Sequence, residues 1–184
     1  MNTAVRLGVT AVAMLGLMAT MPTASAAGQS APTVNQPIET IDIKGIKVDK
    51  EASEESKQII ESNAAVAVAA ANVCGTGYTI STNAVRYGTY GTTYTWTNGT
   101  TSGSSYYDKP ICAVFFNDTG ASKSMGVRLR SNYTADAPAE DFGTYSSYAG
   151  PVYQKRGYCG TAYSYMKSGS TVVVDNIFTV GSCN

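Results

Sequence analysis

The chain has 184 residues, with 13 Lys and Arg, 13 Asp and Glu and no histidine, so its formal net charge at pH 7 is zero. The lack of histidine removes the commonest catalytic base and metal ligand. The largest clusters of basic residues are the pairs Arg128/Arg130 and Lys155/Arg156. This argues against a nucleic-acid-binding protein.

Residues 1–26 have the pattern of a secretory signal peptide. A single basic residue, Arg6, precedes an apolar stretch, and the segment ends in the small residues Ala24, Ser25 and Ala26. The apolar stretch is too short to span a bilayer, and no later stretch reaches the roughly 20 apolar residues of a membrane helix. The sequence therefore predicts an exported protein that has no membrane segment once the signal is removed.

Residues 27–73 differ in composition from the rest of the chain. They contain no aromatic residue and no cysteine, and residues 28–73 have seven Asp and Glu against four Lys. Short apolar stretches on either side of Lys44-Gly45 suit a hairpin, and good helix formers predict a helix over about 51–71. Such a segment could be a pro-segment removed on maturation, a spacer, or a layer packed on the main domain. Its acidic, aromatic-free composition favours a solvated spacer.

Residues 74–184 are rich in Tyr, Thr, Ser, Gly and Val, with turn residues between short apolar segments. The clearest strand contains Met125, Val127 and Leu129, which should point one way while the intervening arginines point the other. Many short strands without a long amphipathic helix predict one all-β domain, an antiparallel sandwich or barrel. The expected strands are 78–82, 84–90, 92–97, 111–117, 123–133, 143–148, 152–155, 162–166, 171–175 and 177–180.

The four cysteines all lie in this domain. Export exposes them to an oxidising environment, where disulfides are the expected state. Of the three possible connectivities, sequential pairing of Cys74 with Cys112 and of Cys159 with Cys183 is favoured because it closes two separate loops and ties down both ends of the domain. The spacings match neither zinc modules nor a redox dithiol, so no metal site and no cofactor is expected.

Two short motifs carry a resemblance to a known family. Cys74 opens a CGxGY stretch, and a YAGPVY stretch precedes Cys159 by a short basic link. The chain thereby resembles the spore-associated protein A family of small secreted actinobacterial proteins over about residues 74–183. The resemblance implies a location at the spore or cell surface and supplies no catalytic residue to carry over to this sequence. Besides the cysteine, the motif residues are Gly75, Gly77, Tyr78, Tyr148, Ala149, Gly150, Pro151, Val152 and Tyr153.

All 13 tyrosines and the single tryptophan follow Cys74. Tyr94 and Trp96 should share one face of a strand, where they would form a sugar-stacking platform if exposed and part of the core if buried. Since the domain has few Leu and Ile, the core interpretation is favoured for both. Tyr106, in the loop before Lys109, is a further candidate for stacking.

Two other groups of residues could suggest an enzyme. Asp136, Glu140 and Asp141 could provide the paired carboxylates of a glycosidase, but they lie around a proline in a stretch that suits a solvated turn. Ser164 and Lys167 have the Ser-x-x-Lys spacing, but in a strand their side chains would point to opposite faces. Neither group supports catalysis.

The sequence therefore predicts a secreted, non-enzymatic protein that is structural or associated with a cell or spore surface. A carbohydrate or cell-wall binding module using Tyr94, Trp96 and Tyr106 is the first alternative. A secreted inhibitor or toxin with a protruding loop at residues 97–109 is the second. Components of the cell wall or spore surface are the expected partners, with neither nucleic acid nor membrane among them.

Overall fold

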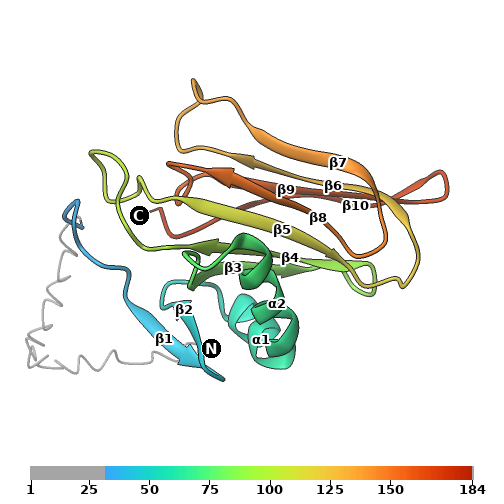
Figure 1. Ribbon diagram of the computed structural model, residues 1–184, viewed down its shortest axis with the longest axis horizontal. Helices are drawn as coiled ribbons and strands as arrows, with labels where there is room; N and C mark the ends of the chain where they lie inside the picture. Colours follow the sequence, from blue (N-terminus) through green and yellow to red (C-terminus); the bar gives the residue numbers. More distant parts are fainter. Residues whose placement is uncertain (1–31, 184) are drawn as a thin grey trace, which may run out of the picture. The chain divides into compact units, whose positions relative to one another are not determined.

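The computed structural model describes residues 32–183, so the predicted signal peptide lies outside the described residues. Ten strands and two helices follow one another along the described chain (Figure 1). They are β1 (Thr40–Ile43), β2 (Ile46–Asp49), α1 (Glu54–Ser62), α2 (Ala64–Cys74), β3 (Ile80–Arg86), β4 (Gly91–Thr97), β5 (Ile111–Asn117), β6 (Lys123–Arg130), β7 (Ala139–Tyr145), β8 (Tyr148–Gln154), β9 (Thr161–Ser168) and β10 (Thr171–Thr179). None of the helices that the structure describes is long and apolar enough to span a bilayer.

The strands form two sheets that pack face to face. One sheet has six strands in the order β1-β2-β3-β4-β5-β8, and the other has four in the order β10-β9-β6-β7. All pairings are antiparallel except that of β2 with β3. The sheets do not close on each other, so the predicted all-β fold is confirmed as a sandwich rather than a barrel. The helices cover the other side of the six-stranded sheet (Figure 1).

The core between the sheets follows the period-2 pattern of the sequence. Met125, Val127 and Leu129 of β6 are buried in it, whereas Arg130 is exposed, which confirms the predicted faces of this strand. Ile111 and Phe115 of β5 fill the core from the opposite sheet. The four-stranded sheet therefore has one buried face and one outward face.

A second core lies between the six-stranded sheet and the helices. Val48 of β2 and Ile60 of α1 are fully buried there against Tyr94 and Trp96 of β4. The Ser56 side-chain oxygen accepts a hydrogen bond from the Ala84 backbone N–H at 2.6 Å. The segment before Cys74 thus forms a packed layer in this structure, which differs from the solvated spacer that its composition favoured. Its lack of aromatic residues misleads because β4 supplies the aromatic rings of this core.

The helical region predicted as one helix over 51–71 is two helices that meet at Asn63. The backbone of Asn63 is not helical, and both its backbone N–H and its side-chain amide donate to the Ile59 carbonyl, at 3.0 and 3.2 Å. An asparagine favours such local bonds with the backbone, and here it ends α1 and starts α2. The predicted hairpin is present as β1 and β2, and Lys44 and Gly45 both have positive φ angles in its turn.

Both predicted disulfides are confirmed. Cys74, at the end of α2, is bonded to Cys112 in β5, with their Cα atoms 5.8 Å apart. Cys159, just before β9, is bonded to Cys183 near the end of the chain, with a Cα separation of 5.4 Å. The first bond joins the helical layer to the sheet, and the second fixes the residues that follow β10.

The predicted strand positions are wrong around the hairpin of β7 and β8. Strands were expected at 143–148 and 152–155, but they occupy Ala139–Tyr145 and Tyr148–Gln154, with the turn at Ser146 and Ser147. β8 includes Pro151, and a proline is tolerated there because β8 is an edge strand. The shift matters because it places Phe142 in β7.

Candidate functional site

The structure buries Tyr94 and Trp96, two of the three candidates for sugar stacking, as the favoured core interpretation predicted. Tyr94 is 1% exposed and Trp96 is 2% exposed, because α1, α2 and β2 pack over their face of the sheet. Tyr106 is half-buried, and its ring lies edge-on to Tyr107 and to Tyr158. No ring face of Tyr94 or Trp96 is open to a sugar in this arrangement.

The CGxGY and YAGPVY stretches, far apart in the sequence, meet in space. The rings of Tyr78 and Tyr153 are 5.6 Å apart, and the Tyr153 hydroxyl donates to the Cys74 carbonyl at 3.1 Å. Tyr148 packs on Phe116, while Ala149 and Val152 are buried between the sheets. Gly75, with a φ of +99°, ends α2, and Gly77 follows it in the chain. Gly150 and Pro151 lie in β8. The motifs thus build the junction of α2 with β8.

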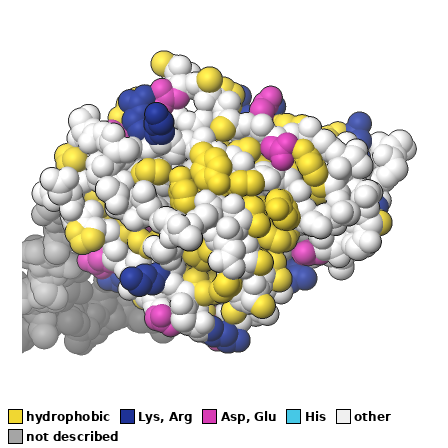
Figure 2. All heavy atoms as spheres, in the orientation of Figure 1, with side chains coloured by type: hydrophobic (Ala, Val, Ile, Leu, Met, Phe, Trp, Pro, Cys, Tyr) yellow, Lys and Arg dark blue, Asp and Glu magenta, His cyan; other side chains and the backbone are white. Residues whose placement is uncertain are grey.

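A crevice of about 400 Å³ opens beside this junction. Val68, Ala71 and Tyr78 give it apolar walls, and Asn72 and Thr76 add polar groups. Figure 2 shows hydrophobic side chains gathered near the middle of one face, over the region where α2 and β8 lie in Figure 1. The crevice shows nothing that selects a particular ligand.

The three carboxylates singled out in the sequence do not face a common point. Asp136 forms two contacts with the Arg156 guanidinium, at 2.6 and 2.8 Å. Glu140 pairs with Arg128, and Asp141 accepts the Gly150 backbone N–H at 2.7 Å. Asp136 lies in a turn, as predicted, whereas Glu140 and Asp141 lie in β7, and each of the three carboxylates is held by its own partner.

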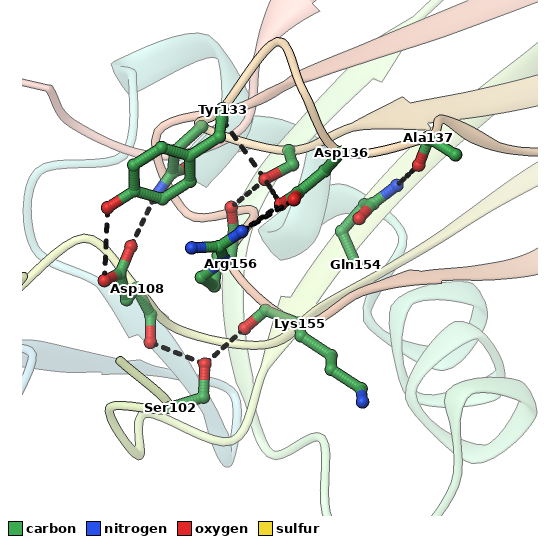
Figure 3. A network of polar contacts seen from close by, with 10 residues as sticks. Ser102, Asp108, Tyr133, Asp136, Ala137, Gln154, Lys155 and Arg156 are labelled. Carbon is green, nitrogen blue, oxygen red and sulfur yellow. Dashed lines mark hydrogen bonds and ion pairs between the residues drawn. The ribbon is translucent and has the colours of Figure 1, made fainter. Parts of the chain in front are cut away.

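Asp136 belongs to a polar network that fastens three loops together (Figure 3). A hydrogen bond from Ser131 and the nearby Arg156 lower the pKa of Asp136. Arg156 also lies over the Tyr133 ring, 4.1 Å from its centroid, and the Tyr133 hydroxyl donates to Asp108 at 3.3 Å. The Ser102 hydroxyl contacts the Asp108 carbonyl at 2.9 Å. The loop considered as a protruding inhibitor loop is thus anchored at residues 102 and 108.

A buried lysine lies at the base of the same loop. Lys109 is fully buried, its ammonium donates to the Tyr106 carbonyl, and it lies 3.5 Å from the Tyr106 ring centroid. Nearby, the Tyr158 hydroxyl donates to Asp49 of β2, which links the helical layer to the rest of the domain. Burial raises the pKa of Asp49 and lowers the pKa of Lys109 to about 8.

We expect the free energy of unfolding to increase between pH 8 and about pH 9. The unfolded chain keeps the Lys109 proton up to its ordinary pKa of about 10.4, so over this interval it binds more protons than the folded chain. Above about pH 9 the trend reverses, because burial raises the pKa of several tyrosines, that of Tyr94 to about 12, and the tyrosines of the unfolded chain ionise first. Urea titrations at several pH values test this, and Lys109→Met should abolish the increase; an increase of the same size in Lys109→Met would contradict it.

The outward face of the four-stranded sheet has an aromatic surface that the sequence did not predict. Phe142 of β7 and Tyr163 and Tyr165 of β9 point outward, with their ring centroids 6.3 to 6.5 Å from one another. Gly126 of β6 lies between β7 and β9, and a Cβ there would be 2.1 Å from Phe142 Cδ1. The glycine therefore leaves room for the Phe142 ring to lie across β6. We call Phe142, Tyr163 and Tyr165 the aromatic platform.

Charged groups surround the platform. The Arg128 guanidinium carbon lies 5.3 Å from the Phe142 centroid and 5.5 Å from the Tyr163 centroid. Arg128 also pairs with Glu140 at 2.5 Å. Burial and a hydrogen bond with Asp175 raise the pKa of Tyr163. Ile177 of β10, opposite Tyr163, is 66% exposed.

No family model, curated protein or solved structure matches this chain. The platform is therefore interpreted from its own geometry. Phe142 is 42% exposed, and contiguous exposed apolar groups with a polar rim mark interaction sites. Rings with nearby charges and hydroxyl groups can stack on the apolar face of a sugar and hydrogen-bond its hydroxyls.

The sequence contains part of the signal for this platform. Tyr163 and Tyr165 alternate with Ala162 and Ser164 in a predicted strand, so their common face was readable. Ser164 is buried and its hydroxyl contacts that of Thr93, whereas Lys167 lies on the outward face of β9. The two side chains thus lie on opposite faces, as predicted for a strand. The third ring was not readable, because β6 separates β7 from β9 and no local pattern encodes that order.

Proposed function

We propose that this chain is an exported, non-enzymatic protein that attaches to polysaccharide at a cell or spore surface through the aromatic platform. The observation that carries the proposal is the set of three outward rings with centroids within 6.5 Å of one another on one rigid sheet face. The resemblance to spore-associated proteins implies the same location. It also makes intact spores and hyphae natural targets to test.

The sheet supports binding because it holds the rings in place before the ligand arrives. The Phe142 ring packs in the space above Gly126, which has no side chain, and the Arg128 guanidinium lies close to both the Phe142 and the Tyr163 rings. A ligand that stacks on ordered rings loses little side-chain freedom on the protein side. A row of rings on the open face of a sheet suits an extended chain of sugars better than a single small molecule, which usually binds in a concave pocket.

We expect a Tyr163→Ala/Tyr165→Ala variant to bind polysaccharide at least about tenfold more weakly than the parent chain, since each lost ring removes about 1 kcal/mol of contact. Both side chains are partly exposed, so the free energy of unfolding should change by about 1 kcal/mol or less. The measurement is adsorption of the oxidised protein to peptidoglycan, chitin, cellulose and intact spores or hyphae.

Tyr153→Ala is the matched control, because Tyr153 is also an exposed tyrosine but lies at the motif junction. It should bind like the parent chain. Loss of binding in Tyr153→Ala, with full binding in the platform variant, would move the site to the motif junction. Adsorption to none of these materials would contradict the proposal. A dimer that dissociates in the platform variant would show that the platform binds a second copy.

A further inference from the structure

We propose that the polysaccharide bound by the platform is acidic and carries carboxylates, as in a uronate polymer. This inference rests on the proposed function, because it assigns a ligand class to the same face. Two observations support it: charged residues flank the three rings, and only some of those residues already form an ion pair within the protein.

The outward residues of the four-stranded sheet form rows across the strands. The register aligns Ser124 with Lys167 at one end of the platform and Arg130 with Thr161 at the other. The rings lie in the rows between them, since Gly126 pairs with Tyr165. Each end of the platform therefore has one cation.

The charged residues of this face differ in whether they already form an ion pair within the protein. Among the anions of this face, Glu140 pairs with Arg128, whereas Asp175, opposite Tyr165 in the register, hydrogen-bonds the Tyr163 hydroxyl and keeps its negative charge. Within the part of the chain that the structure describes, Lys167 and Arg130 form no ion pair. The charge left for a ligand is thus positive at both ends.

The spacing of these cations indicates a polymer. Ser124, in the row of Lys167, lies six positions before Arg130 in β6, which corresponds to about 20 Å at the rise of a strand. A single sugar cannot reach both cations, whereas an extended oligosaccharide can contact both ends and stack on the rings between them. An arginine guanidinium also matches the geometry of a carboxylate.

The rings select a glycan over an open-chain polyanion. In a uronate polymer every unit has a ring face for stacking and a carboxylate at its edge, so one chain satisfies the platform and the cations together. A polyol-phosphate chain, as in many teichoic acids, has charge but no ring in its backbone. It would leave the three aromatic residues without a partner.

The test compares binding of the oxidised protein to alginate, to the neutral glucan hydroxyethylcellulose and to a polyol-phosphate teichoic acid. We expect the tightest binding to alginate and weaker binding to alginate as salt rises from about 50 to about 500 mM. Lys167→Gln/Arg130→Gln should weaken alginate binding about four- to twenty-fivefold, at about two- to fivefold for each charge. It should leave any binding to the neutral glucan unchanged.

Lys47→Gln/Lys155→Gln is the matched control, because it removes two exposed lysines that lie outside the four-stranded sheet. It should bind alginate like the parent chain. If this control loses as much alginate binding as the Lys167/Arg130 variant, the effect comes from the net charge of the protein alone, and the inference is overturned. Preference for the teichoic acid would also overturn it. Undiminished alginate binding in the Lys167/Arg130 variant, with loss in the Tyr163/Tyr165 variant, would overturn the inference alone and leave the proposed function standing.

Discussion

Trp96→Ala should lower the free energy of unfolding by about 3 to 5 kcal/mol, the range typical of large aromatic residues removed from a core. Trp96 is the largest fully buried side chain in the described part of the chain, and it packs in the core beneath the helices. Its neighbours across the sheet, Ser81 and Cys112, are themselves held in strands and cannot collapse into the space. Urea denaturation with the disulfides intact gives the value.

Trp96→Phe is the control for this prediction. The indole N–H of Trp96 has no hydrogen-bond partner among the described residues, so its removal forfeits no bond. The phenylalanine should restore most of the lost stability. If Trp96→Ala unfolds at the same urea concentration as the parent chain, Trp96 is not in a core. Normal stability combined with lost polysaccharide binding would support the stacking role that the sequence alone allowed.

Removing the Cys74–Cys112 bond by replacing both residues with alanine should cost about 4 kcal/mol. The bond closes a loop with a sequence separation of 38, and in the unfolded chain a longer loop gains more freedom when it is released. Cys112 is also fully buried, so the substitution removes some packing as well. The helical layer should loosen first, because this bond is its covalent link to β5.

The second disulfide provides the comparison. The Cys159–Cys183 bond closes a shorter loop, with a separation of 24, and its removal should cost about 3.5 kcal/mol. Hydrogen exchange should show faster exchange in α1 and α2 only in the variant without Cys74 and Cys112. A loss below about 1 kcal/mol in that variant would mean that noncovalent contacts alone hold the helical layer to the sheet.

The sequence was sufficient where the information is local. The alternation in β6 gave its buried face, the Lys44-Gly45 turn gave the first hairpin, and the loop-closing argument gave both disulfides. These features depend on neighbouring residues or on a short list of alternatives.

Nonlocal packing was not predictable in the same way. Trp96 has the same sequence signal whether its face is bare or covered, and only the packing of α1, α2 and β2 decides between them. The platform likewise depends on β6 lying between β7 and β9, which brings Phe142 near two tyrosines about 20 residues further along the chain. A site made from three strands is set by the strand order and register.

Mapping the bound polysaccharide by amide chemical shifts would test the central claim most directly. The oxidised chain would be titrated with soluble oligosaccharides cut from the polysaccharide that it adsorbs best. The account predicts that the largest shifts fall on Gly126, Phe142, Tyr163 and Tyr165. Shifts centred on Tyr78 and Tyr153, or no shifts at saturating oligosaccharide, would contradict it.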